Sequence, residues 1–312
     1  MGHKIRPVDY DKDVADLVAM LDEVMTDGMS ASRYSSWLNS PRPINRHVVA
    51  TDDSGAIVGW SLLDRQANAQ TNKGFISLIV HPNHRRKRIG TALIEDVFAH
   101  CKTVGLSQLN SQVKDNQPNW LAWAESHGFS IERHRYRSSI KLEQFDLVLY
   151  ENRIAELINE GIVFTTLHEL GDTEPNRHLY YEADCKAAID IPGEDSVETW
   201  EEFSAENFNS EGYLPQGMHI AMHQGKMVGV AHAWLDADHN RMVNAMTGVI
   251  PEYRSRGIAT ALKVMTIKYA KDSGIPEILT QNDSENAPML AVNGKLGYKR
   301  WPGAYALKAT LT

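Results

Sequence analysis

The stretch TGVIPEYRSRGIATALKVMTIKYA, residues 247–270, decides the fold. It opens with an apolar, strand-like run that ends at Ile250, because Pro251 cannot continue a strand ladder. After a basic turn, apolar residues recur at helical spacing, namely Ile258, Leu262, Met265 and Tyr269. We therefore predict a strand, a basic turn that contains Gly257, and a helix.

The turn before this helix is suited to hold an anion. The first amides of a helix have no partner within it and lie at the positive end of the helix dipole. Gly257 lets the backbone approach a ligand closely, and Arg254 and Arg256 add positive charge. A diphosphate is the ligand that this turn predicts.

The same stretch occurs twice in the chain. VHPNHRRKRIGTAL from Val80 aligns with VIPEYRSRGIATAL from Val249 at an offset of 169 positions, and the offset carries Gly105 onto Gly274. These segments are not of low complexity, so we infer a duplication. At 312 residues the chain has room for two ordinary domains. We predict one over 1–143 and one over 161–312, joined by a connecting helix over 144–160.

The order of predicted elements is the same in both copies. The first opens with an amphipathic helix, capped by Asp11, and continues with strands at 47–53, 56–64 and 75–80. The second has strands at 219–224, 227–235 and 242–250. Hairpins followed by a strand-helix-strand unit indicate an α/β fold with a mixed sheet.

A second motif, NDSENAPMLAVNGKLGY, begins at Asn282. Together the two motifs resemble the signatures of the GNAT acetyltransferase superfamily: a loop Gln/Arg-x-x-Gly-x-Gly/Ala, and an Asn before a helix that ends in Leu-Gly-Phe/Tyr. Arg254, Gly257 and Ala259 match the first signature. Asn286 and the Leu-Gly-Tyr at 296–298 match the second. The superfamily includes tandem members, mycothiol synthase among them, and the duplicated chain is similar to that architecture.

The resemblance implies two tandem acyl-CoA N-acyltransferase domains that use acetyl-CoA as co-substrate and no metal. It also implies direct attack by an amine in a ternary complex, at a strand that splays from its neighbour. The implied cofactor-binding residues of the second copy are Val249, Ile250, Arg254, Ser255, Arg256, Gly257, Ile258, Ala259, Thr260, Asn286 and Asn293. Those of the first copy are Val80, Arg85 and Gly90.

The first copy departs from the family pattern at two positions. Arg88 stands where the second copy has Gly257, and Gln117 stands where it has Asn286. The side chain of Arg88 either crowds the pyrophosphate or pairs with a phosphate of CoA. Our hypothesis is that the N-terminal copy is catalytically silent and the C-terminal copy is active.

The groups that would move protons are less evident. The strand MVNAMTGVI carries no Asp, Glu or His, so His232 in the adjacent strand is the candidate general base. The alternative is a buried histidine with a structural role. Many family members place a general-acid Tyr seven residues after the Asn, and here that position is Asn293. Tyr298, Tyr253 or solvent could take that role instead.

The acceptor is predicted to be an amine on a small molecule or a peptide. The acidic, aromatic segment 181–203 would border the acceptor site of this fold and favours a cation, although Asp195 and Glu198 also fit a capping box. A formal charge of −8 argues against a nucleic-acid partner. Only the basic run RRKR at 85–88 would favour such a partner. A CoA-binding regulatory or scaffold protein without catalysis remains the alternative function.

The remaining features concern the compartment. The N-terminus lacks an apolar signal region, and no run reaches the roughly 18 apolar residues of a membrane helix. Cys101 and Cys185 are predicted to be free thiols in a reducing compartment. We expect a cytoplasmic protein without a membrane partner. The histidines show no zinc-like pairing, and the sequence leaves the oligomeric state open.

Overall fold

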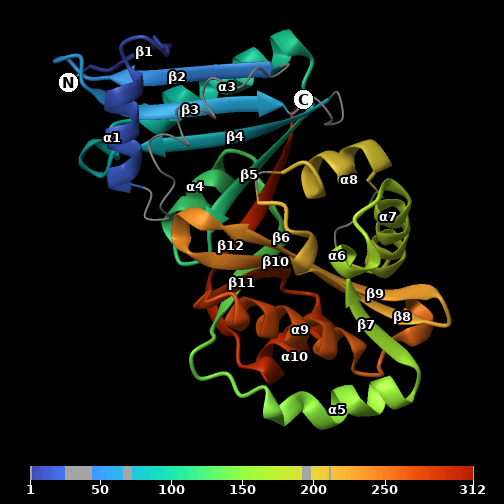
Figure 1. Cartoon of the computed structure of the whole chain (residues 1–312). Helices are drawn as coiled ribbons and strands as arrows, with labels where there is room; N and C mark the ends of the chain where they lie inside the picture. The colour runs from blue at the N-terminus through green and yellow to red at the C-terminus, as the bar shows by residue number, and fades with distance from the viewer. Residues whose placement is uncertain (1, 25–43, 66–71, 192–197, 211, 312) are drawn as a thin grey trace. The chain divides into compact units, whose positions relative to one another are not determined.

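The computed structural model describes residues 2–24, 44–65, 72–191, 198–210 and 212–311. The chain forms two compact units, one of residues 1–132 with 305–312 and one of residues 133–304 (Figure 1). Each unit has a mixed sheet with helices packed against it, as the sequence predicted. In the described part of the chain, no helix is both long enough and apolar enough to cross a membrane.

The first unit contains β1 (Lys4–Pro7), α1 (Val14–Val24), β2 (Ile44–Thr51), β3 (Ile57–Arg65), β4 (Lys73–Val80), α3 (Ile89–Val104), β5 (Gln108–Lys114), α4 (Pro118–Ser126) and the start of β6 (Ser130–Lys141). Strands β1 to β4 pair antiparallel in sequence order. The helix α3 then crosses over, so that β5 lies parallel to β4.

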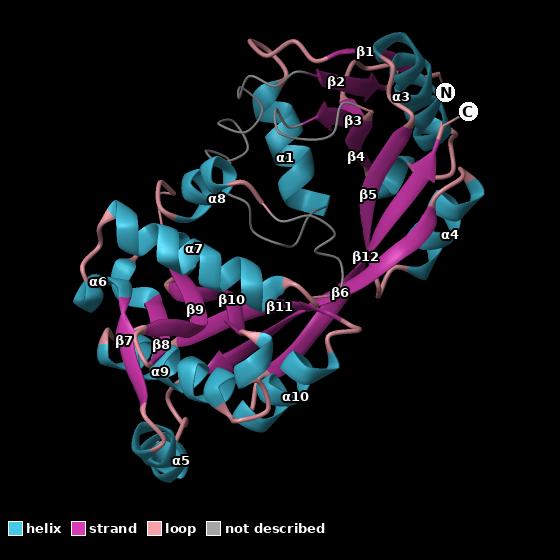
Figure 2. Ribbon diagram, turned by 90° about the vertical axis from the view of Figure 1, so that its right-hand side faces the viewer, coloured by secondary structure: helices cyan, strands magenta, loops and turns pink. Residues whose placement is uncertain are grey.

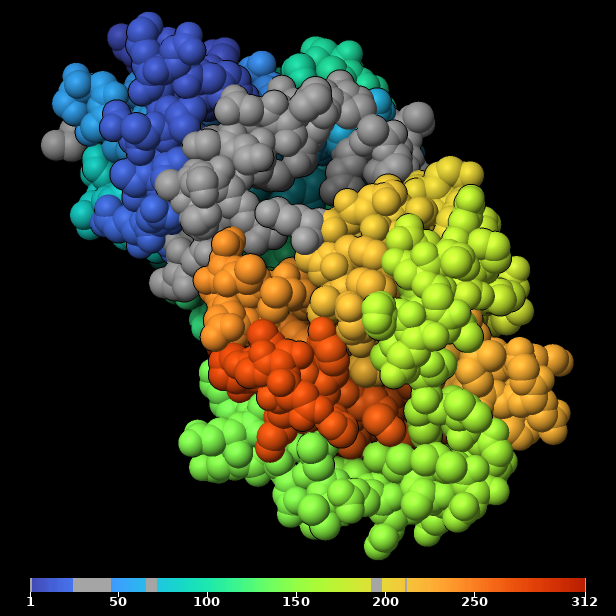
Figure 3. Space-filling view, viewed as in Figure 1, coloured from blue at the N-terminus to red at the C-terminus, as the bar shows by residue number. Residues whose placement is uncertain are grey.

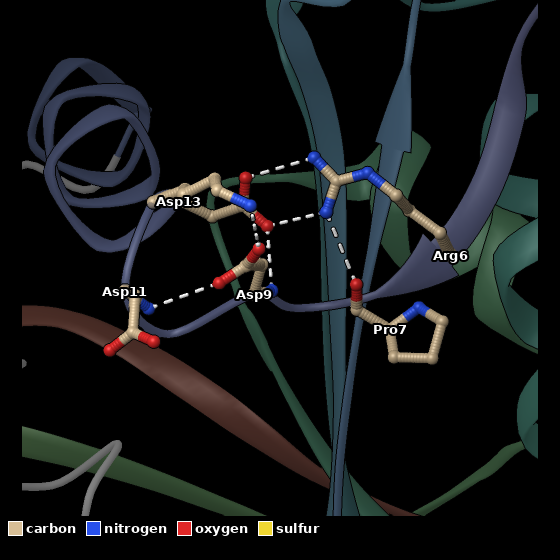
Figure 4. Close-up of polar contacts among 6 residues, drawn as sticks. Arg6, Pro7, Asp9, Asp11 and Asp13 are labelled. Carbon is tan, nitrogen blue, oxygen red and sulfur yellow. Dashed lines mark hydrogen bonds and ion pairs between the residues drawn. The ribbon is translucent and has the colours of Figure 1, made fainter.

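Polar contacts join β1 to the start of α1 (Figure 4). The guanidinium of Arg6 donates to both carboxylate oxygens of Asp13, with 2.8 Å between Nη2 and Oδ1, and lowers the pKa of Asp13. The amide of Leu17 donates to the carbonyl of Asp13, so the helix begins after Asp13. The predicted cap at Asp11 is therefore wrong. Asp11 lies in the preceding turn, where its amide donates to Asp9 Oδ1 at 3.2 Å.

The second unit repeats this topology. After α5 (Val148–Asn159) it contains β7 (Ile162–Thr166), α6 (Leu167–Leu170), α7 (Glu174–Ala188), α8 (Trp200–Asn207), β8 (Met218–His223), β9 (Lys226–Asp236), β10 (Arg241–Val249), α9 (Ile258–Asp272), β11 (Glu277–Asp283), α10 (Ala287–Leu296) and the start of β12 (Lys299–Thr310). Strands β7 to β10 pair antiparallel, and β10 and β11 pair parallel on either side of the crossover helix α9.

The last strand of each copy completes the sheet of the other copy. In the second unit β6 pairs with β11, from Lys141 opposite Glu277 to Arg135 opposite Asp283. In the first unit the end of β12 lies beside β5, and Leu307 packs against Leu109 in the core. Both copies present an equivalent edge at this point, which explains why the two terminal strands can be exchanged.

Helices cover both faces of the second sheet (Figure 2). On one face, Tyr180 and Ala183 of α7 and Phe203 of α8 pack on Met218, Ile220 and Val230. On the other face, Ile258 and Leu262 of α9 pack on Ala221 and Ala231. Helices α7 and α8 form part of the surface in Figure 3, in yellow-green and yellow. Because both faces are covered, the central strands are apolar on both sides.

Candidate active site

The strands β10 and β11 separate partway along their length. Their parallel ladder runs only from Met242 opposite Ile278 to Asn244 opposite Thr280. Beyond it, β10 follows β9 to Val249 and β11 follows β6 to Asp283. At the point of separation β10 has a bulge: Asn244 faces Ala233 and Met246 faces His232, which leaves Ala245 as an extra residue.

The separation exposes an edge of β10 toward the loop. The amide of Ile250 donates to the carbonyl of Val228 in β9 at 3.0 Å, and the carbonyl of Ile250 accepts from Tyr253 N. Because successive residues of a strand direct their amides to opposite edges, the amides of Val249 and Thr247 point toward the open edge. Of the two predicted backbone donors, Ile250 has its amide bonded within the sheet, whereas the amide of Val249 points to the open edge.

The loop after β10 brings a helix start to this open edge. Pro251–Tyr253 forms a short 3-10 turn, and Gly257 precedes α9 with φ +82°. Ser255 has φ +62°, and Ile258, Ala259 and Thr260 form the first turn of the helix. The amides of a first helical turn lack partners within the helix, so they are available to an anion.

The two arginines of the loop are held by carboxylates of the chain. Arg254 donates from Nε to Val249 O at 3.0 Å and from Nη1 to Asp190 at 2.5 Å. Arg256 donates to Glu160 at 2.6 Å. Arg254 therefore ties the loop to the end of α7. The positive charge that the sequence predicted for a diphosphate is partly neutralised by these two carboxylates.

The corresponding loop of the first copy has the same backbone path. Arg85 Nε donates to Val80 O at 3.1 Å, as Arg254 does to Val249. Arg88 begins α3 with φ +62°, a left-handed conformation that favours glycine. A Cβ built on Gly90 would lie 3.3 Å from the ring of Trp123 in α4, so that side chain closes over the start of the helix.

The described β3–β4 ladder of the first copy has no bulge. Its β3–β4 ladder is continuous from Gly59 opposite Val80 to Asp64 opposite Phe75. Its β4–β5 ladder covers three pairs, from Lys73 to Phe75.

The second motif forms the start of α10. Asn286 is the N-cap, and its Oδ1 accepts from Met289 N at 3.2 Å. Asn293 is buried in α10, and its Nδ2 donates to Asn282 Oδ1 of β11 at 2.7 Å. Its own Oδ1 is buried and has no hydrogen-bond partner among the residues that the structure describes. In the first copy, Gln117 precedes α4 but makes no side-chain cap.

Comparison with known proteins agrees with this geometry. The family model described as "Acetyltransferase (GNAT) family" matches twice, over residues 17–129 and 181–298. The chain belongs to the GNAT family of acetyltransferases. The predicted enzyme class, an N-acetyltransferase of GNAT type in tandem form, is confirmed.

Several relatives that align with this chain over most of their length are mycothiol acetyltransferases. A mycothiol acetyltransferase of Saccharomonospora viridis is 26% identical over 81% of each chain, and one of Parafrankia sp. is 24% identical over 92% of this chain and 93% of its own. Among solved structures, a GCN5-related N-acetyltransferase of Sphaerobacter thermophilus has a TM-score of 0.75 at 16% identity, covering 99% of this chain and 96% of its own. A tandem GNAT protein from the clavulanic acid biosynthesis pathway has 0.70 at 19%, covering 100% and 99%. At these identities the structures show the fold alone.

Two of the candidate acid and base residues, His232 and Tyr298, are deeply buried. His232 lies in β9 opposite Met246 of the bulge, and burial lowers the pKa of its imidazole to about 4. Tyr298 lies in the core beside α9, where burial raises the pKa of its phenol. Tyr253 lies in the loop, and its hydroxyl is 2.9 Å from His223 Nδ1. His232 is thus the candidate that adjoins the opened strand.

A buried polar group at the bulge of the second copy was not predicted from the sequence. Lys263 of α9 is fully buried and donates from Nζ to Asn244 Oδ1 at 2.5 Å. Thr247 donates to the same oxygen at 3.1 Å. Burial lowers the pKa of Lys263 to about 7. One signal was available, because the 169-residue offset places Lys263 on Ile94, a position with the apolar spacing of Ile89, Leu93 and Val97.

Helices α7 and α8, which cover the face of the second sheet away from α9, carry the predicted aromatic and acidic side chains. The His178 ring stacks on that of Trp200 with 3.7 Å between centroids, and Tyr181 donates to Glu198 O at 2.5 Å. Asp195 lies outside the described residues, and the capping box of α8 is formed by Thr199 and Glu202. In the described ranges, no three His, Cys, Asp or Glu side chains form a group that could hold a metal ion.

Proposed function

We propose that the second copy binds acetyl-CoA along the open edge of β10 and transfers the acetyl group to an amine. One observation supports this most directly: the edge with the amides of Thr247 and Val249 leads into a helix that begins at Gly257. The amides would hold the thioester carbonyl, and the first turn of α9 would hold the diphosphate. Gly257 leaves room that a side chain would fill.

The chemistry proposed for this edge is acyl transfer. The amine nitrogen attacks the thioester carbon, negative charge develops on the carbonyl oxygen, and the carbon–sulfur bond then breaks to release the CoA thiolate. A backbone donor at that oxygen is worth about 3 kcal/mol in comparable reactions. The amine loses a proton, and the thiolate gains one from solvent or a nearby group.

The proton balance favours an amine of low basicity. A lysine-like amine costs about 4 to 5 kcal/mol to deprotonate at neutral pH, whereas an α-amino group costs about 1 kcal/mol. The pKa of His232, about 4, makes its imidazole a weak base. We therefore propose an acceptor with an α-amino type of amine. The name mycothiol acetyltransferase of the relatives that align over most of their length supports a small-molecule acceptor.

The first copy is proposed to be catalytically silent. Arg88 fills the position of Gly257, Trp123 covers the helix start, and the bulge is absent from the described β3–β4 ladder. The interior of this unit would then stabilise the fold without taking part in acyl transfer.

Release of thiol from acetyl-CoA tests the proposal, with a panel of small α-amines, ε-amines and peptides with free N-termini. Gly257→Arg should abolish release, and Arg88→Gly should leave it unchanged. A Cys185→Ser background keeps the half-buried thiol of the protein out of the readout. Calorimetric binding of acetyl-CoA without release from any amine would support the CoA-binding alternative. If only Arg88→Gly lost turnover, the first copy would be the active one.

A further inference from the structure

We propose that Lys263 and Asn244 are positioning residues that hold the bulge of β10 in the shape required for acetyl-CoA binding and turnover. The inference rests on the proposed function, since it concerns the strand edge assigned to the thioester. Neither side chain is proposed to touch the substrate. Each acts through the backbone of the bulge.

The side chain of Asn244 is fully used at the bulge. Its Nδ2 donates to the carbonyl of His232 at 3.0 Å and to that of Met246 at 2.8 Å. Its Oδ1 accepts from Lys263 Nζ and Thr247 Oγ1. Both donor hydrogens of the amide are therefore used, and its oxygen lies within hydrogen-bond distance of two donors. Through its two donor bonds, Asn244 links His232 and Met246, which face each other next to the extra residue Ala245.

The backbone carbonyl of Asn244 is also bonded, to the neighbouring strand β11. Thr280 of β11 donates from Oγ1 to the carbonyl of Asn244 at 2.9 Å. This contact lies at the last pair of the parallel ladder, where β10 begins to separate from β11. Asn244 is therefore bonded to both neighbouring strands at the residue where the open edge begins.

Lys263 determines which way the amide of Asn244 faces. Its side chain reaches the bulge from α9, and its Nζ lies 4.9 Å from the centroid of the Tyr298 ring. The amine can donate to Oδ1 whether it is protonated or neutral, and its protonated form cannot accept from Nδ2. The two donor hydrogens are thereby directed to the carbonyls of His232 and Met246. Burial of this amine lowers its pKa to about 7, which shows how unfavourable the position is for a lysine.

The first copy shows that the fold does not need this arrangement. There Ile76 faces Leu63, and the carbonyl of Ile76 accepts from Ser111 Oγ at 3.0 Å, as that of Asn244 accepts from Thr280. Ile94 occupies the position of Lys263, and both isoleucines are buried in one apolar cluster. The polar pair and the bulge are present together in the second copy, and the first has an apolar pair on a continuous ladder.

Lys263→Met tests the role, with Ile94→Met as the matched control in the first copy. Lys263→Met should fold with a Tm equal to or above that of the parent, because it removes a desolvated amine. It should bind acetyl-CoA at least tenfold more weakly by calorimetry, and kcat should fall at least tenfold. Lys263→Gln, which keeps a donor for Asn244, should recover most of both. Ile94→Met should leave both unchanged.

A double-mutant cycle with Asn244→Leu completes the test. The losses from Lys263→Met and Asn244→Leu should be strongly non-additive if the residues act as one unit. Parental affinity and kcat in Lys263→Met overturn the inference. A loss that follows Tm and is not recovered by glutamine overturns it as well. If the parent binds acetyl-CoA but no acceptor amine is found, the acetyl-CoA affinities of the variants still test this inference. No binding by the parent defeats the proposed function and this inference with it.

Discussion

Arg88 and Gly257 begin corresponding helices with the same left-handed backbone, at φ +62° and +82°. The loop conformation is therefore fixed by its hydrogen bonds, since the arginine adopts it despite its Cβ. Each loop also has a second left-handed residue two positions earlier, Arg86 in one copy and Ser255 in the other. The two copies retain the loop, and they differ in whether the residue before the helix carries a side chain.

Substitutions at these two positions should change stability in opposite directions. A left-handed non-glycine residue costs about 1 to 2 kcal/mol, part of which the greater freedom of glycine in the unfolded chain offsets. Arg88→Gly should therefore raise the free energy of unfolding by up to about 1 kcal/mol. Gly257→Ala should lower it by about 1 kcal/mol, because its Cβ would also lie 3.2 Å from Arg153 Nε. Urea denaturation curves check both. Equal signs for the two changes would contradict a shared strained conformation.

The second copy should become more stable as the pH rises above 7. The pKa of Lys263 is lowered by burial to about 7 from 10.5, so between these values the unfolded chain binds the extra proton. The free energy of unfolding should then rise by up to about 1.4 kcal/mol per pH unit. Unfolding of parent and Lys263→Met protein at pH 7.5 and 9 measures it. The parent should gain about 2 kcal/mol relative to the variant, and an identical pH dependence would show that Lys263 is solvated.

The sequence predicted the strands and helices that surround the loop because their patterns are local. Apolar spacing after Pro251 located α9, and the strand pattern at 242–250 located β10. The repeat supplied the topology of both units, since one copy reinforced the assignment of the other. In the second copy the sequence predicted a strand, a turn that contains Gly257 and a helix, in the order that the structure shows.

The remaining features depend on contacts between distant residues. Nothing local indicates which terminal strand completes which sheet, because β6 and β12 are equivalent copies. The bulge at Ala245 depends on Asn244 and Lys263, which meet only in the folded unit. A lysine is ordinarily expected at the surface, so helix spacing alone does not identify Lys263 as a buried residue. Its alignment with Ile94 of the first copy is the sequence signal that points to burial.

The two cysteines should differ in reactivity. Cys101 is fully buried in the core of the first unit, and burial raises the pKa of its thiol to about 11. Cys185 of α7 is half-buried, and burial raises its thiol pKa as well. Since the thiolate is the reactive form, a thiol reagent at pH 8 should modify Cys185 slowly and Cys101 only after unfolding. Mass spectrometry of native and denatured protein gives the order. Earlier labelling of Cys101 would mean that the first core opens readily.

Gly248 should be intolerant of even one added methyl group. A Cβ there would lie 2.6 Å from the Cβ of Ala187 in α7 and 2.7 Å from Met246 Cε. Both atoms border the opened strand, so Gly248→Ala must push α7 away or shift β10 at the proposed acyl site. We expect a loss of about 1 to 3 kcal/mol in the free energy of unfolding, and weaker acetyl-CoA binding.

Gly294→Ala is the matched control for this prediction. Gly294 lies on the exposed side of α10, where an added Cβ meets nothing within 4 Å. Because alanine favours a helix over glycine by roughly 0.5 to 1 kcal/mol, this variant should be slightly stabilised and bind acetyl-CoA normally. Thermal unfolding and calorimetry of the pair separate the two effects. If Gly248→Ala retained parental stability and affinity, α7 could not be packed on β10 as tightly as the structure shows, and the open edge would not be fixed by that helix.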